Sequence, residues 1–263
     1  HMKSAKRLPT GPLLGLAGIL GFLLTWELIP RLGVVNPRFL PPASEVLGVF
    51  ISNLGLGAFW AAVVDTMTGW FLGLLIATLA AVVLGLVIGS SNFLRKATNS
   101  TIEFLRPIPS VALIPLAVLL FGFRIESTLL LVVYASFWQV LIQVLYGVAD
   151  VDPVANNTAK SFGLGRLARI RYVVWPTTLP YLMTGVRLAA AVALILAITA
   201  SLIIGSPGLG KEIANAQSGG AIAQMYALVL TTGVLGILIN MGMRIVERRT
   251  LSWHSSVRGE VVV

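Results

Sequence analysis

Residues 66–89 read TMTGWFLGLLIATLAAVVLGLVIG, a run without one charged side chain. An α-helix rises 1.5 Å per residue, so about 20 apolar residues cross the roughly 30 Å hydrocarbon core of a bilayer. The stretch is therefore predicted to be a membrane-spanning helix. The other residues have the same character, because the 263-residue chain is 57% hydrophobic and only 11% charged. Soluble domains are about 25% charged, so this composition excludes a soluble globular protein.

Five further apolar runs of similar length flank this stretch. The six predicted spans are Leu13–Ile29, Thr66–Gly89, Thr101–Phe121, Thr128–Val148, Leu179–Ile204 and Ala223–Val246. The first span follows a basic head as in a signal peptide, but it continues past signal length through Trp26 and is interpreted as a retained helix. The predicted fold class is all-α, a polytopic membrane protein with six transmembrane helices in a single domain over residues 1–263.

The distribution of Lys and Arg predicts the orientation of the spans. With the N-terminus inside, the inside segments hold thirteen basic residues and the outside segments four. The inside residues are Lys3, Lys6, Arg7, Arg95, Lys96, Lys160, Arg166, Arg169, Arg171, Arg244, Arg248, Arg249 and Arg258, and the outside residues are Arg31, Arg38, Arg124 and Lys211. Because cytoplasmic segments carry the excess of Lys and Arg, residues 3–10 and 247–263 are predicted to be a cytoplasmic head and tail.

The scarcity of cysteine and histidine excludes several kinds of site. The chain has no cysteine, so disulfides, thiolate zinc sites and cysteine nucleophiles are excluded. His1-Met2 is interpreted as an expression scar, which leaves His254 as the one remaining histidine. No metal site and no resident cofactor are therefore expected. A nucleic-acid-binding face is not expected either, because such faces need clustered charge on a polar surface.

Two of the connecting segments are long. The outside segment Arg31–Val64 has apolar residues at helical spacing from Ser44 to Trp60, which fits either an amphipathic helix on the outer interface or an ordered loop packed on the bundle. The inside segment 150–176 mixes apolar residues with Lys and Arg at short intervals. Such a segment is predicted to fold and to contact a partner.

This inside segment carries a spaced motif: Asn157-Thr158-Ala159, three residues, Gly163, nine residues, then Val173-Val174-Trp175-Pro176. The motif resembles the signature of ABC importer permeases, in which Glu-Ala-Ala, a glycine and Ile-x-Leu-Pro stand at the same spacing. Asn157, Thr158 and Trp175 depart from it. Further matches resemble the subfamily that imports sulfonates, taurine, nitrate and related small molecules. They are Phe39-Leu40-Pro41-Pro42, residues 104–109, Ile114-Pro115-Leu116, Phe121-Gly122, Gly185-Val186-Arg187, Gly208-Leu209-Gly210 and Trp253-His254.

The resemblance implies a role for the inside segment and a set of partners. In this family the motif forms a short cytoplasmic coupling helix that sits in a groove of an ATPase subunit. The implied coupling residues are Asn157, Thr158, Ala159, Phe162, Gly163, Val173 and Pro176, with Phe162 as the apolar knob. Gly163 is expected to end the helix through a positive φ or a close approach. The implied partners are a second permease copy, two ATPase subunits and an extracytoplasmic binding protein, assembled in the lipid of a bacterial inner membrane.

A second motif imitates an ATP site. Residues 205–212 match the first seven positions of a phosphate-binding loop, but Glu212 replaces the hydroxyl residue that holds magnesium. The string follows a membrane span instead of a buried strand and is interpreted as a turn. ATP and Mg²⁺ are therefore expected on a partner ATPase.

Prolines and polar residues within the spans are candidates for the translocation path. Pro107, Pro109 and Pro115 are predicted to kink the third span, which fits either a helix lining a passage or a bent structural helix. The path candidates in the fourth and fifth spans are Tyr134, Trp138, Gln139, Gln143, Thr199 and Ser201. Hydrogen bonding between helices is the alternative role of these side chains. Small-residue pairs favour close helix packing, at Gly11/Gly15, Gly69/Gly73 and Gly85/Gly89.

These residues are considered against three functions. The favoured one is the permease subunit of an ATP-driven importer working by alternating access, with no covalent chemistry in this chain. A carrier driven by an ion gradient usually needs acids near the middle of the membrane, and here Glu27, Glu103 and Glu247 lie near span ends. The third function considered is that of a membrane enzyme or an assembly scaffold. The substrate stays open among small organic anions such as sulfonates, taurine and aromatic carboxylates, together with nitrate and vitamin precursors.

Overall fold

The computed structural model describes residues 10–253, and it contains helices and no strands over this range. The predicted head at 3–10 lies almost wholly outside the described residues, as do residues 1–2, interpreted as an expression scar, and the tail from His254 onward. The helices are α1 (Thr10–Arg31), α2 (Ala43–Asn53), α3 (Gly57–Gly89), α4 (Asn92–Leu105), the 3₁₀ helix η1 (Ser110–Leu113), α5 (Ile114–Phe121), α6 (Ile125–Ala149), α7 (Pro153–Ser161), α8 (Arg166–Arg169), the π-helical turn η2 (Ile170–Val174), α9 (Trp175–Ile204), α10 (Leu209–Ser218) and α11 (Ile222–Thr250).

Five helical segments are long and apolar enough to cross a membrane, and the count reaches six when α4 and η1–α5 are taken as one bent span. The five coincide with predicted spans, although α3 begins nine residues before the predicted start at Thr66. The third predicted span differs from the expected kinked helix. Its two halves meet at 82° across a break of four residues, so the chain turns sharply at this point.

The prolines explain the position of the break. Pro107 and Pro109 lie between α4 and η1, while Pro115 lies in the first turn of α5, where the missing N–H is not needed. Pro109 has no N–H to offer the carbonyl of Leu105. The Ile108 N–H donates to that carbonyl at 3.2 Å and the Tyr134 hydroxyl at 2.5 Å, so the local turn and a neighbouring helix together satisfy it.

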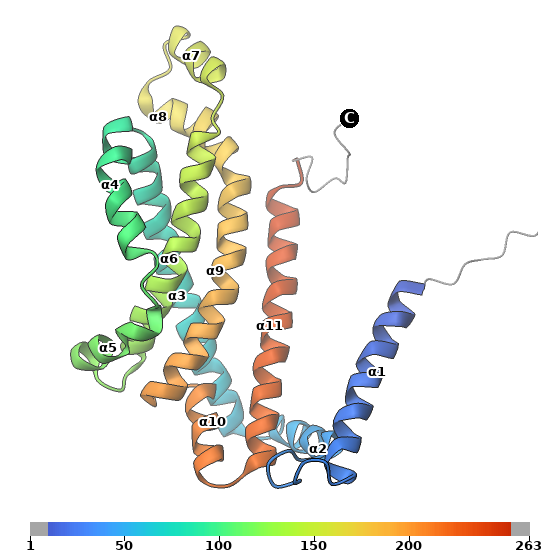
Figure 1. Cartoon of the computed structure of the whole chain (residues 1–263). Coiled ribbons are helices and arrows are strands. Elements are labelled where there is room, and N and C mark those ends of the chain that lie inside the picture. The colour runs from blue at the N-terminus through green and yellow to red at the C-terminus, as the bar shows by residue number, and fades with distance from the viewer. Residues whose placement is uncertain (1–9, 254–263) are drawn as a thin grey trace, which may run out of the picture.

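The centre of the bundle is α6, which packs along both α3 and α9 (Figure 1). On α3 every fourth residue facing α6 is small and buried: Gly69, Gly73, Ala77, Ala81, Gly85 and Gly89. A Cβ on Gly73 would lie 2.4 Å from Cγ1 of Val132 on α6. The small-residue spacing on this helix is therefore a packing surface within the bundle, as predicted. At Gly15 on α1 a Cβ would meet nothing within 4 Å.

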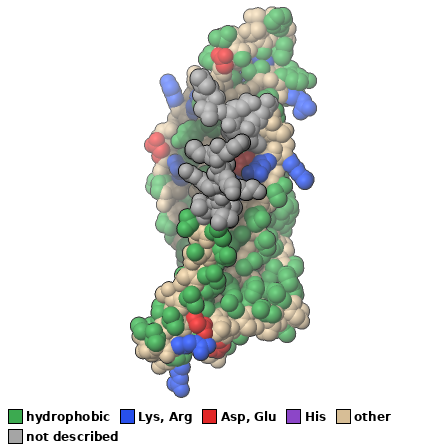
Figure 2. All heavy atoms as spheres, turned by 90° about the vertical axis from the view of Figure 1, so that its right-hand side faces the viewer, with side chains coloured by type: hydrophobic (Ala, Val, Ile, Leu, Met, Phe, Trp, Pro, Cys, Tyr) green, Lys and Arg blue, Asp and Glu red, His purple; other side chains and the backbone are tan. Residues whose placement is uncertain are grey.

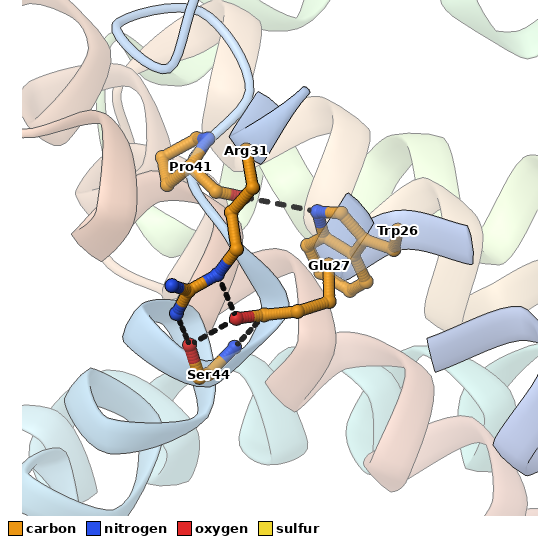
Figure 3. A network of polar contacts seen from close by, with 5 residues as sticks. All are labelled: Trp26, Glu27, Arg31, Pro41 and Ser44. Atoms are coloured by element: carbon orange, nitrogen blue, oxygen red, sulfur yellow. Dashed lines mark hydrogen bonds and ion pairs between the residues drawn. The ribbon is translucent and has the colours of Figure 1, made fainter. Parts of the chain in front are cut away.

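The helix α1 stands apart from this bundle in Figure 1 and packs mainly on α2. Figure 3 shows the contacts that hold them together. The Glu27 carboxylate accepts from the Arg31 side chain at 2.6 Å and from the Ser44 N–H and hydroxyl, each at 2.9 Å. The Trp26 indole donates to the carbonyl of Pro41 at 3.0 Å. A few polar contacts at one end thus fix the direction of an otherwise exposed helix.

The segment from Ser44 to Trp60 contains one helix and the start of another. The helix α2 packs on α11 with Val46 fully buried, while the Ile51 side chain stays 66% exposed. Trp60 already belongs to α3. Both expectations for this segment hold in part, since it is a helix and it is packed on the bundle.

Charged side chains gather toward the two ends of the face seen in Figure 2, and hydrophobic side chains cover the band between them. The helices α7 and α8 lie at one end, with α2 and α10 at the other (Figure 1). The hydrophobic side chains exposed within the band are compatible with contact to membrane lipid. Those exposed at the α7 end require a different explanation.

Candidate functional site

The inside segment folds as a capped helix followed by a tight turn. The Asp152 carboxylate accepts from the N–H of Val154 at 2.8 Å and caps the start of α7. At the other end Gly163 has φ 76°, a conformation that favours glycine, and its N–H donates to the carbonyl of Lys160 at 2.9 Å. The positive φ expected for Gly163 is confirmed. The alternative expectation, a close approach, does not apply, because a Cβ there would meet nothing within 4 Å.

The residues matched to the coupling motif have different surroundings. Asn157 and Thr158 are exposed on α7, whereas Ala159 is buried against the structure that follows. Phe162 is 81% exposed directly after α7. The half-buried residues Val173 and Pro176 lie farther along, in η2 and the first turn of α9.

Pro176 lies in the first turn of α9, just inside the start of that helix. A continuous helical run extends from Arg166 to Ile204, and the π-helical turn η2 lies directly before Pro176. A proline inside a helix removes one backbone hydrogen bond, and a wider π turn accommodates that loss. The span predicted to begin at Leu179 therefore begins before the motif ends.

A second exposed apolar side chain accompanies Phe162. Leu167 on α8 is 84% exposed, and the Arg169 side chain from the same helix donates to the Asn156 side chain on α7 at 3.2 Å. This bond holds α7 against α8. Leu167 is not among the coupling residues predicted from the sequence, and its one signal there is its place in a basic stretch, three residues before Ile170.

The aromatic path candidates lie on one cavity. A cavity of about 780 Å³ lies between the broken span and α6, with Tyr134 and Trp138 in its wall. The two rings meet edge to face with their centroids 5.9 Å apart, and the Trp138 side chain is 9% exposed. The remaining wall is apolar except for Glu126. Tyr134 also donates to the carbonyl of Leu105, at the break between α4 and η1.

The two glutamines lie on a different face of α6. Gln139 and Gln143 are half-buried where α9 approaches α6. The approach is close at Gly185, where a Cβ would lie 3.0 Å from the Cβ of Gln143 and 3.2 Å from the carbonyl oxygen of Gln139. The structure thus separates the glutamines from the aromatic pair that the sequence grouped with them.

Ser201 lies in the last turn of α9, where the start of α10 packs closely against it. Its side chain is 1% exposed and donates to the carbonyl of Ile198 at 3.1 Å. A Cβ on Gly210 would lie 2.1 Å from that same carbonyl oxygen and 2.3 Å from Oγ of Ser201. Thr199, two residues earlier, is half-buried. The surroundings of Ser201 are those of a packing position.

Buried hydroxyl groups bond the connection between α9 and α10 to the bundle. Thr66 on α3 accepts from the N–H of Leu209 at 2.8 Å, and Thr128 on α6 shares a 2.7 Å hydrogen bond with Ser206. Sequence reasoning did not identify these residues, because single Thr and Ser side chains carry no spacing signal. Of the string 205–212, residues 205–208 form the connection between α9 and α10 and residues 209–212 are the first turn of α10, so the interpretation as a turn holds for the first half only.

The geometry is that of a bundle with a folded, partly apolar helical segment at one end. The model of the binding-protein-dependent transport system inner membrane component family matches residues 73–252. The chain belongs to this family. It is thus a permease component of ABC transport and an inner membrane protein, and the resemblance found in the inside motif is confirmed.

Named relatives agree with this membership. The chain is 31% identical over 247 residues to the taurine transport system permease protein TauC of Escherichia coli (strain K12), covering 92% of this chain and 90% of the relative. It is 27% identical to the putative aliphatic sulfonates transport permease protein SsuC of Bacillus subtilis (strain 168), with coverages of 89% and 85%. It is 28% identical to the bicarbonate transport system permease protein CmpB of Synechococcus elongatus, with coverages of 88% and 86%.

Solved structures support the fold. A chain of the MetNI methionine ABC transporter in an inward-facing conformation matches with a TM-score of 0.64 at 14% identity, covering 73% of this chain and 95% of that one. A chain of an amino acid ABC transporter matches with a TM-score of 0.59 at 20% identity, with coverages of 77% and 94%. The arrangement of the helices is therefore that of ABC transporter permeases.

Proposed function

We propose that this permease forms the membrane path of an ATP-driven importer for a small anion of the sulfonate, taurine, nitrate, bicarbonate or aromatic carboxylate type. The observation that carries the ATP-driven part is the inside segment. Phe162 and Leu167 are more than four-fifths exposed beside α7, at an end of the bundle rich in Arg and Lys. Apolar side chains exposed in such surroundings fit a protein partner. The anion class rests on the relatives named above.

The proposed assembly has two permease copies, two ATPase subunits and a binding protein on the outside. ATP and Mg²⁺ bind to the ATPases, which draw the two α7 segments together when ATP binds and let them separate after hydrolysis. The binding protein delivers the anion at the α10 end. The path between the copies then opens alternately to the two sides, without covalent chemistry in this chain.

The proposed topology has six spans and both termini in the cytoplasm. It requires α4 and η1–α5 to serve as one bent span, and it puts α7 in the cytoplasm with the basic residues around it. Residues 150–176 then form the coupling segment. The proposed coupling residues are those that the family resemblance implies, with Leu167 added: Asn157, Thr158, Ala159, Phe162, Gly163, Leu167, Val173 and Pro176. The proposed path residues are Tyr134, Trp138, Gln139, Gln143, Thr199 and Ser201.

Import of a vitamin precursor by the same architecture is the alternative cargo. A carrier driven by an ion gradient is less favoured, since Glu27 is engaged with Arg31 and Ser44 at the end of its span and Glu247 lies 3.5 Å from Arg187. Neither carboxylate stands free near the middle of a span, where ion coupling would use it.

The test is the native mass of the chain purified in mild detergent after co-expression with its ATPase and binding protein. A particle with two copies of permease and two of ATPase supports the proposal. Uptake of labelled taurine, an alkanesulfonate, nitrate and bicarbonate by the reconstituted assembly then identifies the anion. A stable transport-competent particle that lacks the ATPase would contradict the proposal, and uptake would then be tested for dependence on an ion gradient.

A further inference from the structure

A cavity of about 630 Å³ lies beside the coupling segment, at the α7 end of the bundle. It is bounded by the turn between α3 and α4, the end of α6, and the helices α7 and α8. Its polar wall consists of Ser90, Asn92, Arg95, Asn156, Arg166 and Arg169. Neither the proposed transport path nor the coupling surface of Phe162 and Leu167 uses these side chains.

The charge of this wall is not balanced by the chain. Arg95 donates to the carbonyl of Gly89 at 2.8 Å, and Arg169 donates to the Asn156 side chain, both neutral acceptors. Nε of Arg169 is buried and has no hydrogen-bond partner within the described chain. No Asp or Glu is among the described residues that line the cavity, and none of the three arginines takes part in an ion pair within residues 10–253.

The nearest acidic residues in sequence have other partners. Asp150 accepts from the Tyr181 hydroxyl at 2.9 Å, on the side of a separate cavity that both residues line. Asp152 caps the start of α7 through the N–H of Val154. The wall therefore keeps its positive charge, and a buried unpartnered guanidinium N–H costs free energy until an acceptor binds.

The chemistry of the wall specifies an acceptor with several oxygens. Guanidinium groups present forked pairs of N–H donors, which match phosphate oxygens in two-point contacts. The 14-residue helix α4 begins at the same wall, with Asn92 as its first residue and the Ser91 hydroxyl accepting from the N–H of Leu94 at 3.5 Å, so its N-terminal end adjoins the same space. Three arginines and a helix N-terminus together favour a phosphate group over a singly charged, weakly solvated anion.

The remaining wall indicates where such a phosphate comes from. Leu86 and Val87 at the end of the α3 span line the cavity, and the Val87 side chain is 50% exposed on the bundle surface. The polar wall therefore adjoins apolar surface that continues into the membrane-spanning region. We propose that this cavity binds the phosphate headgroup of an anionic phospholipid through Arg95, Arg166 and Arg169, with the acyl chains along α3. This site goes beyond the proposed transport function.

A lipid held in this way would link parts of the molecule that have few other contacts. The strongest contacts of α7 within the described chain are with α8 and η2. A phosphate bridging Arg95 on α4 and Arg169 on α8 would tie the coupling segment to the turn between α3 and α4. Hydrogen exchange of the amides in 153–169 is therefore expected to slow when the lipid binds.

The experiment is native mass spectrometry of the full chain with palmitoyl-oleoyl phosphatidylglycerol or with the phosphatidylcholine of the same acyl chains. The wild-type chain is expected to retain the anionic lipid preferentially. Each arginine removed is expected to weaken retention about tenfold, since a hydrogen bond to a charged group contributes about 1.5 kcal/mol or more. The test variants are Arg95→Gln and Arg166→Gln, which leave the bond between Arg169 and Asn156 intact, and Arg169→Gln completes the series. Arg171→Gln, on the same helical run but outside this cavity, is the matched control and is expected to bind like the wild type.

Three outcomes would overturn the proposal. The first is equal retention of phosphatidylglycerol by the wild type and by Arg95→Gln and Arg166→Gln. The second is equal retention of the two lipids together with strong binding of millimolar inorganic phosphate, which would identify a site for free phosphate. The third is unchanged lipid retention in variants that lose the ATPase during co-purification, which would assign the arginines to protein docking. Lipid retention is measured on the permease alone, so this test is independent of the transport proposal.

Discussion

The contact between α3 and α6 and the coupling segment at 150–176 use apolar residues in opposite ways. Along α3 a row of Gly and Ala lets α6 approach so closely that Val132 and Val144 on α6 are almost completely buried. In the coupling segment Phe162 and Leu167 remain exposed by more than four-fifths. The apolar surface of the first region is matched within the chain, and that of the second is not.

This difference separates what the chain does alone from what it does in an assembly. The close contact of α3, α6 and α9 needs no partner, so changes in it are expected to alter folding before they alter transport. The coupling segment is a capped helix linked to α8 by Arg169 and Asn156, and changes on its exposed face are expected to alter transport without altering folding. The following substitutions test this division in order of decreasing effect.

Gly210→Val is expected to have the largest effect. Its Cβ would lie 2.1 Å from the carbonyl oxygen of Ile198 and 2.5 Å from the N–H nitrogen of Leu202, and neither backbone atom can move without distorting α9. The variant is expected to lose at least about 3 kcal/mol of stability and to be recovered in poor yield. The measurement is the yield and elution profile in mild detergent. Gly233→Ala on α11, where a Cβ meets nothing within 4 Å, is the control and should match the wild type.

Phe162→Asp and Gly163→Glu are expected to abolish transport while the chain stays folded. The aspartate removes an exposed apolar contact, and the glutamate places a side chain on a backbone with φ 76°. Uptake by the reconstituted assembly should fall below about a tenth of wild type, as expected when an interface anchor is lost. Phe162→Leu keeps an apolar side chain and should retain most of the activity. Normal uptake by both variants would remove the argument that the segment docks an ATPase.

Gly73→Ala is expected to have an intermediate effect that a second change relieves. The new Cβ would lie 2.4 Å from Cγ1 of Val132, which costs about 1–3 kcal/mol unless the valine gives way. Adding Val132→Ala removes that methyl group and should restore part of the loss. The measurement is the thermal unfolding midpoint of both single variants and the double variant. Additive losses would mean that the two positions do not share a contact.

Arg187→Gln is expected to have the smallest effect. The Arg187 side chain lies 3.5 Å from the Glu247 carboxylate and is 41% exposed, so solvent and headgroups screen the pair. The expected loss is less than about 1 kcal/mol. A double-mutant cycle with Glu247→Gln measures the coupling free energy. A value of several kcal/mol would place this pair with the tightly packed contacts of the bundle.

The sequence predicted most of the fold because the relevant signals are long and repeated. Apolar runs of about 20 residues predicted the five long helices, and the spaced motif predicted the family. Pro107 and Pro109 predicted where the third span is interrupted. A proline shows where a backbone hydrogen bond is lost, but it does not determine the direction in which the chain turns. The 82° angle depends on tertiary contacts such as the hydroxyl of Tyr134 with the carbonyl of Leu105.

The site was less predictable because polar residues within a span have no periodic rule. Gln139 and Gln143 were grouped with Tyr134 and Trp138 by their spacing on α6, yet the close approach at Gly185 turns the two pairs to different neighbours. Ser201 is a path candidate as a polar residue of the fifth span, yet its side chain is buried against Gly210, nine residues later. Such contacts arise from the meeting of two helices and leave no signal in either one.

The unbroken helical run from Arg166 to Ile204 has a mechanical consequence. At 1.5 Å per residue it is roughly 55–60 Å long, with the coupling segment at one end and the close contact with Gly210 at the other. No loop interrupts the run, which contains the π-helical turn η2 and Pro180, and near its middle Gly185 is pressed against α6. A tilt of such a run by about 5° around its middle would displace each end by about 2–3 Å, in opposite directions. In the proposed mechanism, a movement of the coupling segment would therefore be accompanied by a displacement of the opposite sign at the α10 end.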